Sequence, residues 1–294
     1  MNDNLNLLNL KNEIILQKLD GYLVPRTDMF NGEEVHFSNE RLKAISNFSG
    51  SAGIALILKS KAVLFIDGRY RIQVTKEVNL DEWIIENYEE NCLLKWINEN
   101  IQGNIKIGFD PWLLSYKAFN NLYKSNLKTL CTFVPIENNL VDKIWYNRPK
   151  SYKSRLLDWN ESFAGDNNYL KIENFTNKMK ENKIDAFIIS SPQDLAWLLN
   201  IRGLDLTYTP ILLAFGILHV DKSIEIFCEN KIELKTNKLK IKTLKTIDLK
   251  ASLSKLNKRI IGLESSICPY QIILWLNKMK INFKNIDSFL SIKK

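Results

Sequence analysis

The sequence predicts an α/β protein of two tandem domains, each a mixed β-sheet flanked by helices. Its 294 residues suffice for two domains with separate cores. A hydrophobic content of 45% and a charged content of 25% are typical of a globular protein. Short apolar runs alternate with amphipathic segments of helical spacing, and this order restarts after residue 167.

Two stretches of the second half echo stretches of the first at corresponding places. Residues 185–190 (DAFIIS) echo residues 20–25 (DGYLVP), and residues 259–264 (RIIGLE) echo residues 104–110 (NIKIGFD). In each half a helical pattern precedes the first stretch and another follows the second. The chain is therefore predicted to contain a duplicated α/β domain.

Residues 147–167 form the expected boundary between the halves. They contain Pro149, several charges and the Gly-Asp-Asn breaker at 165–167. We expect a first domain over 1–148 and a second over 149–294, with Trp145 and Trp159 each packed against its own domain.

The elements of the first half follow from apolar spacing and breakers. Asp20-Gly21 ends the opening helix. The run 54–58 is continuously apolar and predicts a strand buried on both faces. The turn at 59–61 joins it to the next strand in a hairpin. Helices are expected at 5–19, 40–45, 71–77 and 91–98 and from Pro111 onward, and strands at 22–24, 54–58, 62–66, 82–85 and 106–110.

Apolar spacing and breakers also define the elements of the second half. Between residues 231 and 250, Lys alternates with Leu, Ile and Thr, which predicts an exposed strand face with its charges in solvent. Helices are expected at 169–182, 193–199 and 270–279, and strands at 185–190, 208–219, 223–228 and 259–264.

The hairpin carries the most distinctive residues of the chain. The small-residue run 49–53 precedes its first strand, and the second strand leads into Asp67-Gly68-Arg69-Tyr70. Functional side chains often lie where a rigid sheet meets a mobile rim. An Asp-Gly pair is also a common turn signal, so a plain turn with a solvated Arg69 remains an alternative.

Composition argues against several classes of partner. The net charge is +8, from 41 basic and 33 acidic residues, but the lysines are dispersed and no nucleic-acid-binding module is present. No apolar run approaches the roughly 18 residues that span a bilayer. The polar N-terminus lacks the basic region of a secretory signal. We therefore expect no nucleic acid, no membrane and a cytoplasmic protein.

Residues for metal or nucleophilic chemistry are sparse. The four cysteines lie far apart without a CxxC pair, which favours buried free thiols. His36 lacks the spacing of a zinc-binding helix, and His219 lies in an apolar strand. No nucleophile elbow, P-loop or dinucleotide fingerprint is present. An enzyme with a site of its own is a further alternative and would need a pocket with convergent carboxylates. The sequence offers scattered pairs such as Glu33-Glu34 and Glu89-Glu90, which are more typical of solvated faces.

Several motifs, in one order, resemble the first two domains of the Xaa-Pro aminopeptidases (aminopeptidase P, in the creatinase-like superfamily of metallopeptidases). Residues 48–53 and 67–70 look like the family's hairpin, and 20–25 looks like its opening strand. The other matching stretches are 39–42, 139–145 with Arg148-Pro149, and 196–205.

The resemblance implies a non-catalytic role for this chain. Enzymes of this family carry catalysis in a C-terminal domain of pita-bread fold that usually holds two Mn²⁺ ions, and no stretch here matches its ligand motifs. The resemblance therefore implies that this chain corresponds to the enzyme without that domain, holds no cofactor and is inactive alone. Its domains would shape the substrate entrance and support a homodimer; its partners would be short proline-containing peptides and the catalytic domain. The alternative is a stand-alone, catalytically dead module that binds peptides or dimerises.

The same resemblance implies roles for individual residues. Arg69 is the candidate to reach peptide carbonyls or a C-terminal carboxylate, with Asp67 and Tyr70 positioning it. A purely structural Asp67–Arg69 pair is the alternative. In the second domain, Arg202 and Asp205 either face the catalytic domain or fix their own loop, and an internal ion pair is favoured.

The small residues Gly50, Ser51 and Gly53 are expected to permit tight packing. A phosphate-binding loop would lead into a helix N-terminus, whereas here a strand follows.

Overall fold

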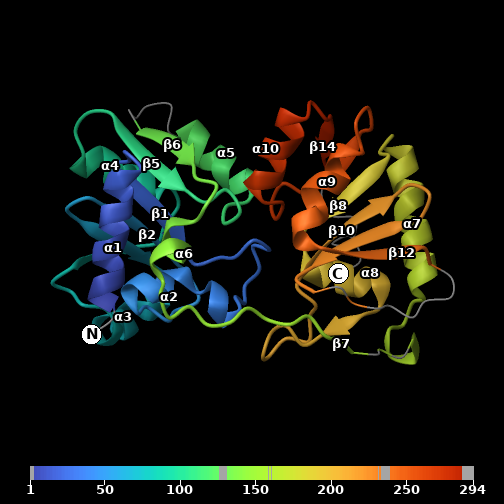
Figure 1. The fold of residues 1–294 in the computed structure, drawn as a ribbon, viewed down its shortest axis with the longest axis horizontal. Coiled ribbons are helices and arrows are strands. Elements are labelled where there is room, and N and C mark those ends of the chain that lie inside the picture. Colours follow the sequence, from blue (N-terminus) through green and yellow to red (C-terminus); the bar gives the residue numbers. More distant parts are fainter. Residues whose placement is uncertain are drawn as a thin grey trace. The chain divides into compact units, whose positions relative to one another are not determined.

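The computed structural model describes residues 3–125, 131–157, 159, 161–230, 232 and 239–286. The chain divides into two compact units, each with its own sheet (Figure 1). The first unit comprises Met1–Asp28, Glu33–Leu114 and Ala118–Lys150, and the second Met29–Gly32, Ser115–Lys117 and Ser151–Lys294. The predicted class, α/β with two mixed sheets and flanking helices, is confirmed.

The first unit is built on a six-stranded sheet in the order β4-β3-β2-β1-β5-β6. Its middle strands are apolar and buried, as expected of strands covered on both faces. The strands are β1 (Gly21–Pro25), β2 (Gly53–Leu58), β3 (Ala62–Ile66), β4 (Trp83–Asn87), β5 (Ile105–Phe109) and β6 (Cys131–Pro135).

Helices contribute apolar side chains to the core of the first unit. Leu10 and Ile14 of α1 pack with Leu42 and Ile45 of α2 and with Tyr22 of β1 in one buried cluster. The helices are α1 (Asp3–Leu16), α2 (Arg41–Ser46), α3 (Arg71–Glu77), α4 (Cys92–Asn100), α5 (Tyr116–Ser125) and α6 (Leu140–Ile144).

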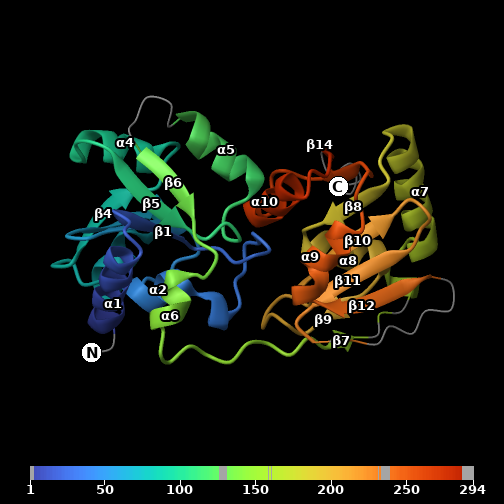
Figure 2. The same ribbon diagram turned by 45° about the horizontal axis from the view of Figure 1, so that its top comes forward.

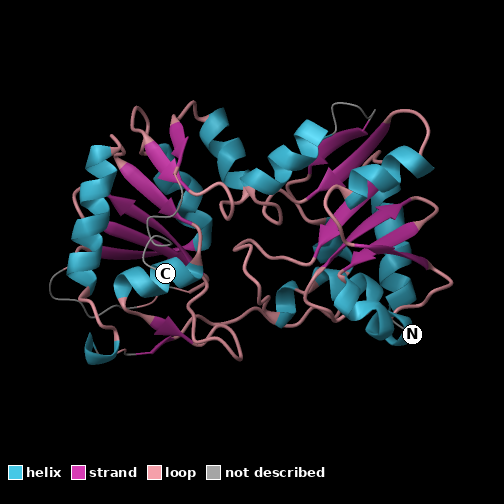
Figure 3. Cartoon of the chain, turned by 180° about the vertical axis from the view of Figure 1, so that it is seen from behind, coloured by secondary structure: helices cyan, strands magenta, loops and turns pink. Residues whose placement is uncertain are grey.

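The second unit contains another six-stranded sheet, in the order β12-β11-β10-β8-β13-β14 (Figure 2). Helices lie against it (Figure 3). The strands are β8 (Ala186–Ile189), β10 (Ala214–His219), β11 (Ile224–Cys228), β12 (Ile241–Lys245), β13 (Ile261–Leu263) and β14 (Phe283–Asn285), with β7 (Leu156–Leu157) and β9 (Arg202–Gly203) as a separate pair. The helices are α7 (Asn168–Glu181), α8 (Pro192–Leu199), α9 (Leu249–Ser254) and α10 (Tyr270–Lys278).

The two sheets have one topology, which confirms the predicted duplication. In each, the first strand is antiparallel to the hairpin and parallel to the strand on its other side. An aspartate directly precedes the first strand of each sheet and forms hydrogen bonds with the parallel neighbour of that strand. The Asp20 N–H donates to the Lys106 carbonyl (2.8 Å), and the Lys106 N–H donates to the Asp20 carboxylate (3.0 Å). Asp185 makes both bonds with Ile260 (2.9 and 2.8 Å).

A glycine occupies the corresponding position of each parallel neighbour, opposite an aromatic residue. Gly108 lies opposite Tyr22, and Gly262 lies opposite Phe187. A Cβ on Gly108 would come within 2.5 Å of Leu19 and 3.0 Å of Tyr22. A Cβ on Gly262 would come within 2.6 Å of the Phe187 ring. The absence of a side chain at both positions makes room for the ring across the sheet.

Two expected boundaries were wrong. The helix expected from Pro111 begins at Tyr116, because Asp110 accepts a hydrogen bond from the Trp112 N–H (2.9 Å) and holds a turn that buries Leu113. The strand expected over 208–219 begins at Ala214, since the preceding residues form a loop around a buried carboxylate.

The sequence also left short elements unassigned. Strands β6, β7, β9 and β14 and helices α6 and α9 were not expected. Within the lysine-rich stretch, Lys242 and Lys245 are exposed on edge strand β12, as predicted. Residues 231 and 233–238 of that stretch lie outside the described residues.

Replacing Gly108 or Gly262 with Ala should lower the free energy of unfolding by about 1–3 kcal/mol, because an aromatic ring must move in a close-packed core. Urea titration followed by circular dichroism measures this. Gly68→Ala is the matched control, since its Cβ would meet nothing within 4 Å, and it should change stability by less than about 0.5 kcal/mol. Equal effects at all three positions would contradict this account of the glycines.

Candidate functional site

The candidate site lies where the β2–β3 hairpin leads into α3. Strand β3 ends at Ile66, and Asp67 caps a single 3-10 turn, Gly68–Tyr70, that continues into α3. The Asp67 carboxylate accepts a hydrogen bond from the Arg69 N–H (3.0 Å), as a capping aspartate does. Hairpin and cap together determine where residues 67–70 lie.

The side chain of Arg69 is exposed to solvent, and a hydrogen bond to Asp67 fixes its orientation. Its Nε donates to Asp67 Oδ1 over 2.9 Å, and its side chain is 69% exposed. No described residue accepts a hydrogen bond from its two terminal Nη groups. The hydrogen bonds from Arg69 lower the pKa of the Asp67 carboxyl, so Asp67 is anionic at neutral pH. The local Asp67–Arg69 pair is present, and it leaves the outer edge of the guanidinium free for a ligand.

Tyr70 links Arg69 to the small-residue run. The Arg69 guanidinium lies 5.5 Å from the centre of the Tyr70 ring. The Tyr70 hydroxyl is 2.6 Å from Ser51 Oγ, and this hydrogen bond lowers the pKa of Tyr70. The Tyr70 and Phe48 rings form a T-shaped contact with centroids 5.6 Å apart. The structure thus brings together the two motifs that the sequence singled out.

The glycines of the run make room for Phe48. A Cβ on Gly50 would overlap the Phe48 ring. A Cβ on Gly53 would lie 3.0 Å from the Phe65 carbonyl oxygen and 3.2 Å from the same ring. No anion-binding arrangement accompanies them, since Gly53 begins strand β2.

Glu77 of α3, which the sequence analysis missed, fixes the start of this run. Its carboxylate accepts hydrogen bonds from the Ser49 N–H (2.8 Å) and the Ser49 hydroxyl (2.6 Å). Gln73, one turn earlier on α3, donates to Ser49 Oγ (2.8 Å) and to Glu77 (2.9 Å). The spacing of Gln73 and Glu77 places them on one helix face, which is the signal that could have indicated their joint role.

Arg202 and Asp205 do not form the expected internal ion pair. Asp205 is buried, which raises the pKa of its carboxyl, and it accepts hydrogen bonds from Leu213 N–H (2.8 Å) and Ser154 Oγ (3.1 Å). Arg202 donates to the Ile201 carbonyl (2.8 Å) and lies 4.6 Å from the centre of the Trp159 ring. The donors to the Asp205 carboxylate are backbone N–H groups and a hydroxyl, and Arg202 contacts other groups.

The two histidines each have a hydrogen-bond partner, and three of the four cysteines are buried. His36 is buried and hydrogen-bonds Ser38 Oγ through Nδ1 (2.8 Å), and burial lowers the pKa of its imidazole. His219 pairs with Glu225 (3.2 Å), as expected of a strand histidine with a partner. All four cysteines are free; Cys92 is partly exposed and the others are buried.

The donor set needed for a metal pair is not found in the part of the chain that the structure describes. No group of three or more His, Cys, Asp or Glu side chains there could hold an ion. A site for two Mn²⁺ ions needs several converging carboxylates, so these residues do not fit such a centre. Across the same residues, no helix has the length and hydropathy of a membrane span.

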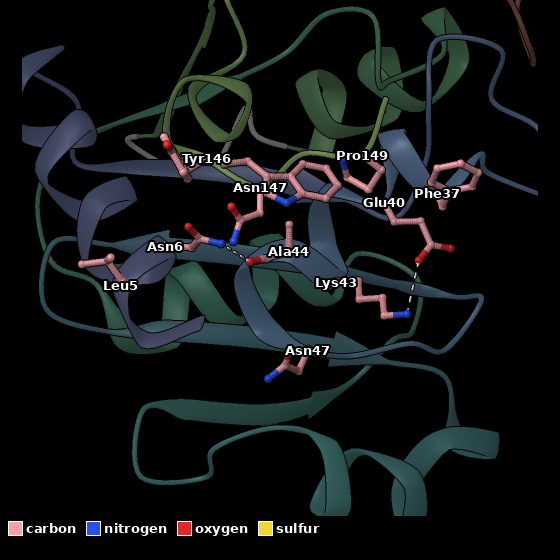
Figure 4. A pocket seen from close by; sticks show the side chains of 11 residues that line it. Leu5, Asn6, Phe37, Glu40, Lys43, Ala44, Asn47, Tyr146, Asn147 and Pro149 are labelled. Atoms are coloured by element: carbon pink, nitrogen blue, oxygen red, sulfur yellow. Dashed lines mark hydrogen bonds and ion pairs between the residues drawn. The ribbon is translucent and has the colours of Figure 1, made fainter. Parts of the chain in front are cut away.

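A hollow of about 440 Å³ lies elsewhere on the first unit (Figure 4). Residues of helices α1 and α2 line it together with residues 145–147 and Pro149, and Phe37, Tyr146 and Pro149 supply apolar surface. Lys43 and Glu40 form a pair at one side (4.0 Å). None of the residues around Arg69 contributes to this hollow, so it is a separate feature.

Protonating Glu77 should weaken the fold. Burial acts to raise the pKa of this carboxyl, but the hydrogen bonds from Ser49 and Gln73 outweigh it and hold the pKa below its ordinary value of 4.5. The carboxylate therefore stabilises the folded state above pH 4.5 and loses that contribution as the pH falls through its folded pKa. The stability difference between wild type and Glu77→Gln should shrink below pH 4.5 in urea titrations.

Exposed Glu90→Gln is the control, and its difference from wild type should show no such trend. A Glu77→Gln difference that stays constant from pH 7 to pH 3 would contradict the role assigned to the carboxylate.

Comparison with family models identifies both halves of the chain. Residues 7–144 and residues 147–294 each match the creatinase/prolidase N-terminal domain. Aminopeptidase P1 of Arabidopsis thaliana is 34% identical over 220 residues, which cover 74% of this chain and 34% of the relative. Aminopeptidase P1 of Lotus japonicus is 32% identical, covering 80% of this chain and 37% of the relative.

A solved structure shares the whole fold. It is an X-prolyl aminopeptidase of Caenorhabditis elegans, described as a cytosolic enzyme with a di-nuclear active site. It matches with a TM-score of 0.89 at 24% identity, over 98% of this chain and 50% of that one. The chain spans about a third of the length of the curated relatives described above. With both halves matched, the chain belongs to the creatinase/prolidase N-terminal domain family and contains two such domains in tandem.

Proposed function

We propose that this chain provides the two N-terminal domains of a cytoplasmic Xaa-Pro aminopeptidase, divided between residues 148 and 149, and that it acts with the catalytic domain of such an enzyme. The observation that carries the proposal is the match of both halves to the creatinase/prolidase N-terminal domain, together with the identity to relatives named aminopeptidase P. In this role the domains shape the substrate entrance and support packing in a homodimer.

Arg69 is the residue proposed to meet the substrate. A guanidinium offers paired N–H donors in a plane, which suits a peptide carboxylate or carbonyl better than a lysine ammonium does. The contacts with Asp67 and Tyr70 hold the side chain in place before a ligand arrives, which reduces the entropy lost on binding. Tyr70 is itself held by Ser51.

Metal chemistry is assigned to the catalytic domain. The X-prolyl aminopeptidase of Caenorhabditis elegans is described as having a di-nuclear active site. We propose that the ions of this enzyme are two Mn²⁺, and the described residues of this chain do not fit them. The contribution of this chain is therefore to bind and orient a short proline-containing peptide.

The purified chain should not hydrolyse an Xaa-Pro tripeptide when Mn²⁺ is added, because the required ligand set belongs to the catalytic domain. Release of the N-terminal residue is measured by liquid chromatography, with aminopeptidase P1 of A. thaliana as the positive control. Metal-dependent turnover that co-purifies with the chain would overturn the assignment of catalysis to another domain.

Arg69 should recognise the C-terminal carboxylate of the peptide. Calorimetric titration with Ala-Pro-Ala should give weak binding that falls about 10- to 100-fold for Arg69→Ala, because one charge-assisted hydrogen bond contributes about 1.5–3 kcal/mol. Arg69→Lys should retain part of the affinity, and exposed Arg71→Ala should retain all of it.

The C-terminally amidated peptide separates charge recognition from general binding. It should bind wild type and Arg69→Ala equally. A loss on Arg69→Ala that is the same for both peptides would instead indicate contact with a carbonyl group. Equal binding of Ala-Pro-Ala by wild type and Arg69→Ala would contradict a substrate role for Arg69.

A further inference from the structure

Two aromatic rings that line the hollow on the first unit are held in place by neighbouring side chains. The Phe37 ring lies against the ring of buried His36, with centroids 3.9 Å apart, and Phe37 is 54% exposed. The Arg148 guanidinium lies over the Trp145 ring, 5.8 Å from its centre, and the Trp145 backbone N–H donates to the Val141 carbonyl of α6 (3.0 Å). Rings that are already fixed lose little conformational freedom when a ligand packs on them.

The rest of the hollow is also formed within the first unit. The side-chain amide of Asn6 on α1 donates to the Ala44 carbonyl of α2 (2.8 Å), and Figure 4 shows this hydrogen bond below an edge along which Tyr146 and Pro149 lie. Tyr146 is 98% exposed and Leu5 is 55% exposed. Exposed apolar side chains that adjoin a hollow mark a binding surface, and the volume of about 440 Å³ is within the range of ligand sites.

The polar groups available at the hollow are mainly hydrogen-bond donors. Four of the polar side chains that line it form no hydrogen bond with any described residue: Asn47, Trp145, Tyr146 and Asn147. Each of the four can donate, and the indole N–H of Trp145 can only donate. A ligand with many acceptors and few donors therefore suits this set.

The charged side chains around the hollow leave an excess of positive charge. Two carboxylates each pair with two cationic side chains: Glu40 with Arg26 and Lys43 (3.4 and 4.0 Å), and Asp142 with Arg41 and Arg148 (2.7 and 2.9 Å). Each group thus has two positive charges against one negative charge. The Lys43 side chain lines the hollow and is 54% exposed, so its ammonium is accessible to a ligand. A ligand with a carboxylate complements this charge.

Fixed aromatic rings, free donors and positive charge together match one kind of ligand, a proline-rich segment with an acidic residue. Such segments adopt the polyproline II helix, in which the backbone carbonyls have no internal hydrogen bond and the proline nitrogens have no hydrogen to donate. Aromatic-lined grooves recognise them because the proline rings pack against the aromatic side chains.

We propose that the hollow binds a proline-rich segment that carries an acidic residue. Its proline rings pack against Trp145 and Phe37, a backbone carbonyl accepts from the Trp145 indole N–H, and its carboxylate lies beside Lys43. The inference rests on the first unit alone and is independent of the proposed peptidase role.

Calorimetric and NMR titrations of the full chain with acetyl-Pro-Pro-Pro-Pro-Glu-amide test the proposal. Both ends of this peptide are blocked, so it has no terminal carboxylate for Arg69. We expect saturable binding with a shift of the Trp145 indole N–H signal, which Trp145→Phe identifies by its disappearance. The peptide with alanine in place of every proline should bind about tenfold more weakly, because it is not already in the bound conformation. Equal affinity for the two peptides would overturn the proposal.

Substitutions at the hollow test its aromatic contacts. Trp145→Phe keeps a ring but loses the indole N–H, and affinity for the proline peptide should fall about fivefold, as expected for one neutral hydrogen bond. Tyr146→Ala should also weaken binding. Tyr208→Ala is its matched control, since Tyr208 is 90% exposed on the second unit, and should bind like wild type. Arg69→Ala should bind like wild type as well, and a loss in either control would contradict binding at the hollow.

Lys43→Gln tests the contact with the carboxylate. It should weaken binding of the glutamate peptide about threefold, as expected for an exposed ion pair, and leave binding of the same peptide with glutamine unchanged. Lys95→Gln, at an exposed lysine of α4, is the control and should affect neither peptide. An equal loss for both peptides on Lys43→Gln would contradict the assigned contact.

Sedimentation velocity tests a second copy of the chain as the occupant of the hollow. The proposal predicts that Tyr146→Ala leaves the oligomeric state unchanged while it weakens peptide binding. Self-association that Tyr146→Ala abolishes, with no shift of the Trp145 indole signal on addition of the peptide, would assign the hollow to a second copy and overturn the proposal.

Discussion

Burial of the first strand of each sheet on both faces is the constraint on which the rest of this structure depends. Tyr22 and Phe187 lie on these strands and occupy the space left by the glycine opposite. Asp20 and Asp185 fix the register with the parallel neighbour by paired hydrogen bonds. Because a shift of one residue would turn every side chain to the other face, these ties determine the whole sheet.

The central strands of the first sheet also hold the candidate site in place. Strand β2 pairs with β1 on one side and with β3 on the other, so the end of the hairpin is held by the centre of the sheet. Three hydrogen bonds between side chains stabilise that end. Asp67 bonds Arg69, Ser51 bonds Tyr70, and Glu77 bonds Ser49. An exposed arginine is thus supported by side chains that are each fixed by another contact.

Local patterns in the sequence predicted the strands, the hairpin and the duplication, because apolar runs and an Asp-Gly turn are decided by neighbouring residues. The chain from Pro111 to Tyr116 could not be predicted in this way, since Asp110 and buried Leu113 compete with helix formation. The expected Arg202–Asp205 pair was wrong for a related reason. Proximity in sequence does not reveal that Leu213 and Ser154 supply the donors for Asp205. The contribution of Glu77 likewise depends on a contact between residues 28 positions apart.

The central claim is that the end of the β2–β3 hairpin around Arg69 is the surface that meets a peptide. Chemical-shift mapping of the isotope-labelled chain during titration with Ala-Pro-Ala tests it most directly. The account predicts shifts concentrated at the amides of 49–53 and 67–71. Saturable shifts confined to other residues, such as those lining the hollow beside Trp145, would contradict it.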